Sequence, residues 1–198
     1  MAHRECRGGR VLSRRRALAR IGRLLAAALL AALPAGSARA GRMAGATPDE
    51  AASRDDGPGP APVRVGALRC PYCSMSVIDA RFAAQQVTTG GRVYVYDAIE
   101  CLVDHIAGHG GPVLAAGWCF VADHEASTRD EASLLSVHVA QLRHHPRLRT
   151  PMGGGLVAFA SEQQADAFAA ERGLDGIEVW TWDGLVERSR ERPWIPLL

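Results

Sequence analysis

Soft metal ligands are concentrated in one short segment of the chain, Cys70-Pro71-Tyr72-Cys73-Ser74-Met75. Two thiols separated by two residues can form a redox pair or supply half of a zinc site. A thioether two residues after the second thiol is required by neither, whereas thiolate and thioether ligands together favour Cu(I). The segment therefore permits three interpretations, and Met75 is the residue that favours copper.

A second methionine stands outside any apolar periodic run. Met152 lies in the sequence TPMGGG, which is expected to form a loop between two strands. A methionine of the core normally belongs to a periodic apolar pattern. Met152 is thus a candidate thioether ligand, and packing against a neighbour is the alternative interpretation.

The zinc interpretation needs two further ligands. Cys101 and His105 are four residues apart in an expected helix, so they share one face. With Cys70 and Cys73 they would make a Cys3His site. The alternative is a buried Cys101 and a surface His105. A redox pair would require the two cysteines at the start of a helix, but a turn and a strand are expected there, which makes this the weakest interpretation.

The sequence contains no motif that indicates a nucleophilic or hydrolytic enzyme. It contains no G-x-S-x-G, H-E-x-x-H, phosphate-binding loop or paired-carboxylate signature. Cys119 lies in a strand pattern and is expected in the core. The pair His144-His145 stands in a polar stretch that is expected to be solvated.

The first forty residues are expected to be a cleaved export signal. Ser13 to Leu18, SRRRAL, resembles a twin-arginine motif with Ala17 in place of the usual Phe, and the apolar run 24–33 is too short to span a bilayer. Residues 41–66 are rich in Pro, Gly, Ala and Asp, which predicts a flexible tether. Without residues 1–40 the chain keeps 14 arginines and 20 acidic residues, a formal charge of −6. A nucleic-acid partner is therefore not expected.

Two similar series of elements must position the candidate ligands. The first comprises strands at 82–88 and 92–96, a helix at 98–108 capped by Asp97, and a strand at 117–123. The second comprises strands at 133–142 and 155–160, a helix at 162–173 capped by Ser161, and a strand at 177–182. This order predicts an α+β domain over 67–198, with units at about 67–123 and 133–185. The C-terminal tail is expected to be irregular, with Trp194 packed.

Two stretches resemble the NosL family, copper-binding accessory proteins linked to nitrous oxide reductase maturation. They are CPYCSMSVIDARFAAQQVTTGGRVYVYDAIECLVDHI and TPMGGGLVAFASEQQADAFAAERG. The resemblance implies two ββαβ units, similar in fold to organomercurial lyase. It also implies a Cu(I) site formed by Cys73 and Met75, with Met152 as the third sulfur ligand and Cys70 as a further candidate. Family members are commonly lipoproteins, and this chain lacks the lipid-accepting cysteine.

We therefore expect a periplasmic Cu(I)-binding accessory protein that is not an enzyme and does not span the membrane in mature form. Its expected partner is a copper enzyme, nitrous oxide reductase above all, or the machinery that matures it. Two alternatives stay open. One is a structural zinc module using Cys70, Cys73, Cys101 and His105. The other is an organomercurial-lyase-like enzyme, for which the sequence places no acid among the cysteines.

Overall fold

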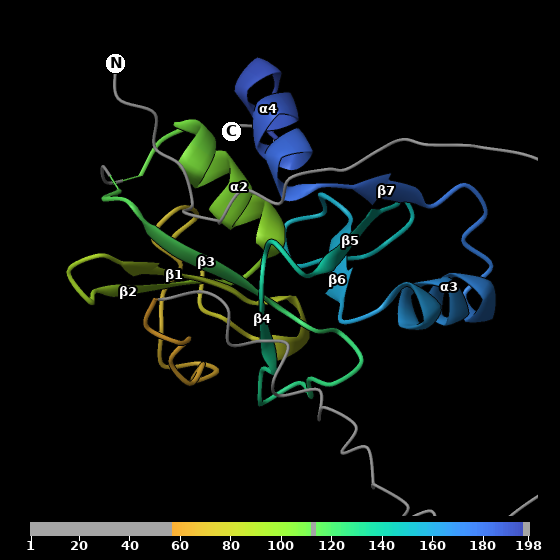
Figure 1. Ribbon diagram of the computed structural model, residues 1–198, viewed down its shortest axis with the longest axis horizontal. Helices are drawn as coiled ribbons and strands as arrows, with labels where there is room; N and C mark the ends of the chain where they lie inside the picture. The colour runs from red at the N-terminus through yellow and green to blue at the C-terminus, as the bar shows by residue number, and fades with distance from the viewer. Residues whose placement is uncertain (1–56, 112–113, 196–198) are drawn as a thin grey trace, which may run out of the picture.

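The computed structural model describes residues 57–111 and 114–195, in which the order strand–strand–helix–strand occurs twice (Figure 1). After the short 3-10 helix η1 (Ala80–Phe82), the first unit comprises β1 (Ala84–Thr88), β2 (Val93–Tyr96), α2 (Ile99–Ala107) and β3 (Gly117–Ala122). The second unit comprises β5 (Gln141–His144), β6 (Leu156–Phe159), α3 (Glu162–Glu171) and β7 (Glu178–Trp180). The expected α+β fold with two ββαβ units is confirmed.

The first sheet is antiparallel and has the strand order β2-β1-β3-β4, where β4 spans Leu134–Ser136. Helix α2 lies across one face of this sheet (Figure 1). Its apolar residues Ile99, Leu102, Val103 and Ile106 are all buried. The helix ends at Gly108, whose φ of 99° is a left-handed conformation that glycine adopts without strain.

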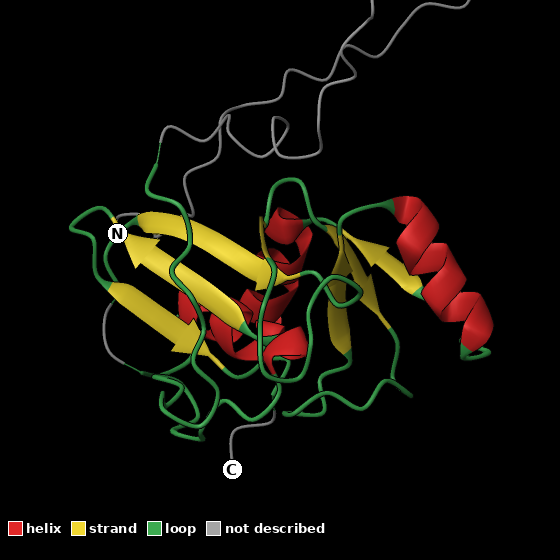
Figure 2. Cartoon of the chain, turned by 90° about the horizontal axis from the view of Figure 1, so that it is seen from below, coloured by secondary structure: helices red, strands yellow, loops and turns green. Residues whose placement is uncertain are grey.

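The second sheet is also antiparallel and has the strand order β6-β5-β7. Helix α3 lies at the end of the molecule farthest from the first sheet (Figures 1 and 2). Ser161 caps it through a capping box with Gln164, as the sequence predicts. Ala165 and Phe168 are buried, and Ala169, which was also expected to face inward, packs partly buried against the same cluster.

One apolar core runs through both units. It contains residues of the first sheet, α2 and the second sheet. A further helix, α4 (Trp182–Glu191), packs against α2 on the side away from the first sheet (Figure 1). Helix α4 was not predicted from the sequence. Trp194 is buried and its indole N–H donates to the Leu185 carbonyl, so its expected packing role is confirmed.

The single strand predicted over 133–142 is wrong. β4 ends at Ser136, the chain turns, and β5 begins at Gln141 in the other sheet. The backbone N–H groups of Val139 and Ala140 both donate to the Ser136 carbonyl, which closes the turn. The alternation of side chains continues through this turn without Gly or Pro, so the pattern alone does not reveal it.

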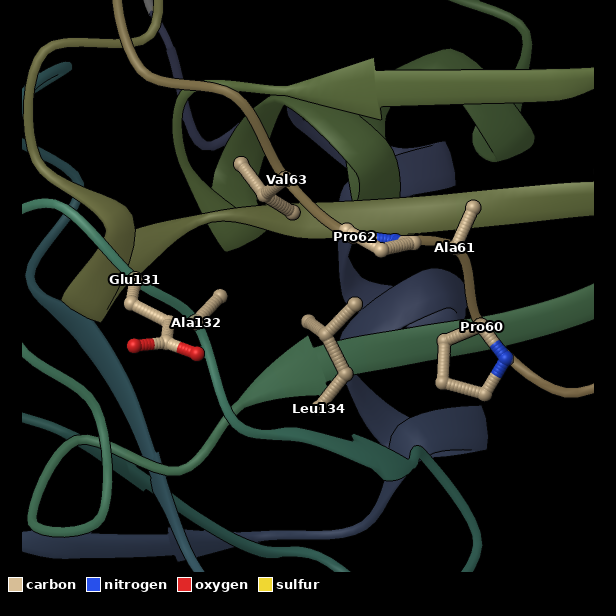
Figure 3. A pocket seen from close by; sticks show the side chains of 7 residues that line it. All are labelled: Pro60, Ala61, Pro62, Val63, Glu131, Ala132 and Leu134. Carbon is tan, nitrogen blue, oxygen red and sulfur yellow. The ribbon is translucent and has the colours of Figure 1, made fainter.

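The packed region starts earlier than the sequence analysis expected. Within the predicted tether 41–66, the backbone N–H and C=O of Ala61 pair with the Gln85 side-chain amide, and Val63 is buried. The stretch from Pro60 to Val63 lines a pocket with Glu131, Ala132 and Leu134 (Figure 3). The predicted export signal and residues 41–56 lie outside the described residues. Among the helices of residues 57–111 and 114–195, none is long and apolar enough to cross a bilayer.

Candidate metal centre

The segment from Cys70 to Met75 is a closed turn. The Cys70 N–H donates to the Met75 carbonyl (2.8 Å), and the Ser74 N–H donates to the Cys70 carbonyl (2.9 Å). Ser74 has a φ of 65°, the only positive value among the described non-glycine residues. This conformation bends the chain between Cys73 and Met75. Cys73 is half-buried and packs against the core, whereas the Met75 side chain is 45% exposed.

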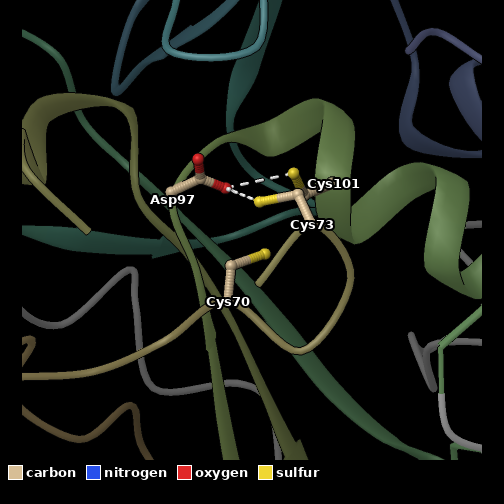
Figure 4. Close-up of side chains that lie close together, drawn as sticks. All are labelled: Cys70, Cys73, Asp97 and Cys101. Carbon is tan, nitrogen blue, oxygen red and sulfur yellow. Dashed lines mark hydrogen bonds between the residues drawn. The ribbon is translucent and has the colours of Figure 1, made fainter. Parts of the chain in front are cut away.

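Four potential ligands converge below this turn (Figure 4). The Sγ atoms of Cys70, Cys73 and Cys101 and a carboxylate oxygen of Asp97 all lie within 4.8 Å of one another. Cys70 and Cys101 are buried. Three elements supply the four residues: the turn, the junction after β2, and the first turn of α2. The site therefore depends on the packing of α2 against the first sheet.

Asp97 lies at the centre of this group instead of capping α2. Its Oδ1 accepts hydrogen bonds from Cys73 Sγ (3.3 Å) and from Cys101 Sγ (3.1 Å). The N-cap residue is Ala98, which has no side-chain capping bond, so the predicted role of Asp97 as N-cap is wrong. Its Oδ2 is buried and finds no hydrogen-bond partner among the described residues. The carboxylate is thus directed to the thiols.

The three thiols differ in how readily they lose a proton. A hydrogen bond from Cys101, with backbone N–H groups of Cys73 and Asp97, outweighs burial and lowers the pKa of Cys70 to about 7. Burial raises the pKa of Cys73 to about 12. The hydrogen bond with Cys70, together with burial, raises the pKa of Cys101. Cys70 is therefore the first thiolate of the group.

Of the four residues proposed for a Cys3His zinc site, three converge and one does not. His105 lies one turn further along α2, and its Nδ1 is 3.0 Å from the Tyr96 hydroxyl. It is not part of the convergent group, in which Asp97 takes the fourth position. His105 is 2% exposed, so the expectation of a surface histidine is also wrong. Cys119 is buried in β3, as expected.

The loop that carries Met152 is attached directly to α2. Glu100, the residue before Cys101, accepts hydrogen bonds from Thr150 Oγ1 (2.5 Å) and the Leu156 N–H (3.1 Å) through Oε1. A Cβ atom at Gly154 would lie 2.3 Å from Glu100 Cγ, so only glycine permits this approach. Met152 packs against the core cluster that contains Cys70 and Cys101. Glu100 is fully buried, and this burial raises its pKa.

Residues 64–185 match the sequence model of the NosL family. The chain belongs to the NosL family. The fold agrees with this assignment, because the structure is similar to the crystal structure of the copper chaperone NosL from Shewanella denitrificans. The TM-score is 0.51 at 16% sequence identity, covering 64% of this chain and 95% of that chain. No curated protein matches the sequence.

The chemistry of the ligands is consistent with the copper-binding character of the NosL family. Thiolates bind Cu(I), zinc and other thiophilic ions, and the carboxylate adds a harder oxygen ligand. Sequence reasoning identified Cys70, Cys73 and Cys101 but assigned Asp97 to a helix cap. The available signal was its position: an acid four residues before Cys101 can face the same side of the helix start.

Proposed function

We propose that this NosL-family protein is a periplasmic accessory protein that binds Cu(I) and delivers it for maturation of a copper enzyme. The first candidate for that enzyme is nitrous oxide reductase. The observation that carries the proposal is the convergence of Cys70 and Cys73 at a turn that also carries Met75. Met152 packs on the same core cluster. Sulfur ligands of this kind stabilise the reduced copper ion.

In this proposal Cys73 and Met75 bind the ion, and Met152 and Cys70 complete a site of low coordination number. Met75 is 45% exposed and follows the bend at Ser74. A thioether at the surface can be exchanged for a ligand of an acceptor protein while the thiolates still hold the ion. The protein would therefore release copper by stepwise ligand exchange and not by unfolding.

Replacing the two central ligands tests the assignment. We expect Cys73→Ser and Met75→Leu to weaken Cu(I) binding by about tenfold or more, since each removes a sulfur ligand and the tenfold loss equals about 1.4 kcal/mol. Competition with a coloured Cu(I) chelator measures the affinity. Met43→Leu, outside the matched family region, is the matched control and should bind as the parent does. Equal retention of Cu(I) by all variants would disprove the site.

Delivery and location need separate experiments. Cu(I)-loaded protein should transfer its ion to metal-free nitrous oxide reductase or to its maturation machinery, and the transfer should fail with Cys73→Ser.

The proposed export signal is tested by a fusion. Residues 1–40 fused to a folded reporter should direct the reporter to the periplasm. Replacement of Arg14 and Arg15 by lysine should abolish that export, because twin-arginine signals require both arginines. Export that persists in the double variant would indicate another pathway.

A second candidate function rests on Asp97. The resemblance to organomercurial lyase implies cleavage of a carbon–mercury bond by paired cysteines and an acid. No acid was expected among the cysteines, but Asp97 Oδ1 lies 3.3 Å from Cys73 Sγ and 3.1 Å from Cys101 Sγ. In such a reaction two sulfurs would take the mercury and a thiol proton would go to the carbon. Release of the hydrocarbon from an organomercurial salt, lost in Asp97→Asn, would favour this function over copper delivery.

A further inference from the structure

We propose that Cys70, Cys73, Cys101 and Asp97 form a second, buried metal site for a thiophilic divalent cation such as Zn²⁺, which is distinct from the Cu(I) site and shares two thiols with it. The proposal goes beyond copper delivery, because it uses two residues, Asp97 and Cys101, that the Cu(I) site does not need. It also requires neither methionine.

The spacing of the four ligand atoms fits a tetrahedral ion. With a Zn–S distance of about 2.3 Å and a Zn–O distance of about 2.0 Å, such a site separates sulfur from oxygen by about 3.5 Å and two sulfurs by about 3.8 Å. Asp97 Oδ1 lies 3.3 Å and 3.1 Å from the sulfurs of Cys73 and Cys101. All four atoms lie within 4.8 Å of one another. Closure around an ion therefore needs shifts of about 1 Å or less.

The type of ligand favours a divalent ion over Cu(I). Cu(I) prefers two or three soft ligands, whereas Zn²⁺ accepts thiolate and carboxylate together in a four-coordinate site. Asp97 contributes a hard, buried carboxylate oxygen, and its Oδ2 lacks a hydrogen-bond partner among the described residues. A dipositive ion would compensate this buried carboxylate better than a monopositive one.

The local backbone supports the negative ligands. Cys101 lies in the first turn of α2, where the partial positive charge of the helix N-terminus stabilises a thiolate. On binding, each coordinating thiol that still carries a proton would release it to solvent, and its sulfur would take the ion in exchange.

Because both sites use Cys70 and Cys73, an ion in one site leaves fewer sulfur ligands for the other. The Cu(I) site lies toward the surface with Met75, and the divalent site lies inward with Cys101, which is fully buried. A divalent ion in the inner site would withdraw both shared thiols from copper. The two metals should therefore compete for one protein molecule.

Titration of the reduced full chain with Zn²⁺, and with Cd²⁺ as a spectroscopic probe of thiolate ligands, tests the proposal. We expect one bound ion per chain. Cys101→Ser should weaken Zn²⁺ binding by more than about 100-fold, and Asp97→Asn by about 10–100-fold. In both variants the affinity for Zn²⁺ should fall by a larger factor than the affinity for Cu(I), and circular dichroism should verify their folding. Met75→Leu and Met152→Leu should instead weaken Cu(I) binding and keep the Zn²⁺ affinity of the parent.

Several results would overturn the inference. They are the absence of Zn²⁺ binding by the parent, Zn²⁺ binding that is unchanged in both Cys101→Ser and Asp97→Asn, or simultaneous binding of one Zn²⁺ and one Cu(I). Loss of Cu(I) binding in both Cys101→Ser and Asp97→Asn would show a single site. Failure of the copper proposal is distinguishable, since the parent would then bind Zn²⁺ but would not retain Cu(I) against a chelator.

Discussion

Ser74 has a backbone conformation that is unfavourable for its residue type. Its φ of 65° lies in the left-handed region, which costs an L-residue other than glycine, Asn or Asp about 1–2 kcal/mol. The hydrogen bonds of the turn around it hold the conformation in place. The bend allows Cys73 to point inward while Met75 stays exposed, so the unfavourable conformation lies where the candidate ligands diverge.

Replacing Ser74 by glycine should therefore stabilise the protein. Relief of the left-handed strain exceeds the additional entropy of the unfolded chain, and we expect a gain of roughly 0.5–1 kcal/mol in the free energy of unfolding. Urea unfolding measures the gain. Ser76→Gly is the matched control: Ser76 pairs with Arg69 in an extended bridge, so glycine should destabilise it. Destabilisation by Ser74→Gly would contradict the argument.

At the scale of elements, α2 determines the site. It supplies Cys101 to the thiol group, and through Glu100 it holds the loop that carries Met152. The helix begins at Ile99, two residues after Asp97, so the carboxylate and the Cys101 thiol are brought together by the strand-to-helix junction. Both methionines are thus positioned by backbone features, a bend at Ser74 and a glycine loop on Glu100.

Loss of the Glu100 carboxyl should loosen the Met152 loop. Glu100→Ala leaves Thr150 Oγ1 and the Leu156 N–H without their acceptor and opens a cavity, which we expect to cost about 2–4 kcal/mol of stability. Glu100→Gln keeps an acceptor of the same shape and should cost much less. Cu(I) affinity should fall in Glu100→Ala and be retained in Glu100→Gln.

Urea unfolding and chelator competition measure the two effects of the Glu100 variants. Glu171→Ala provides the control, because the Glu171 side chain is 78% exposed and pairs only with neighbouring Arg172 among the ion pairs of the described residues. An equal loss of stability in Glu171→Ala and Glu100→Ala would contradict the proposed anchoring.

The same elements show which parts of the fold could be predicted from the sequence. Strand and helix patterns and turn signals predicted both ββαβ units, and Ser161 was correctly predicted to cap α3. These are local features. The failures were tertiary: the turn after Ser136 moves the chain from one sheet to the other, and α4 is held by its packing on α2. The position of Asp97 among the thiols depends on how the Cys70 turn packs on α2, which no local pattern encodes.

At the scale of the whole molecule, the two units are joined by polar contacts as well as by the core. The backbone N–H of His124 donates a hydrogen bond to the Ala158 carbonyl of β6 (2.9 Å). Its ring lies against Phe82 of the first unit and against Phe159 and Phe168 of the second. This burial lowers the pKa of His124, despite the nearby Glu125 carboxylate.

Stability should consequently fall as the pH drops below the unfolded-state pKa of His124, which is 6.5. Below this pH the unfolded chain binds a proton that the folded chain does not, so acid favours unfolding, with a slope of up to about 1.4 kcal/mol per pH unit until the lower folded pKa is reached. Urea unfolding between pH 7.5 and pH 5 measures the slope. His124→Gln should reduce it, and an unchanged slope in this variant would assign the effect to other groups.

Helix α2 also anchors the C-terminal segment. Asp104 accepts hydrogen bonds from Ser189 Oγ and from the backbone N–H groups of Trp194 and Ile195. The first turn of α2 thus serves the thiols and the Met152 loop, and the next turn serves the chain end. All residues of α2 from Ile99 to Ile106 are buried.

A helix that is buried from Ile99 to Ile106 has few positions at which a mutation leaves the packing unchanged. Most surface helices diverge quickly on their outer side, but every side of α2 touches a sheet, a loop or another helix. As the NosL family evolved, replacements in α2 would have required compensating changes in a contacting element. Changes in the metal chemistry proposed for this chain would then arise mainly in the turn before α2 and the loop around Met152, while the helix between them stayed the same.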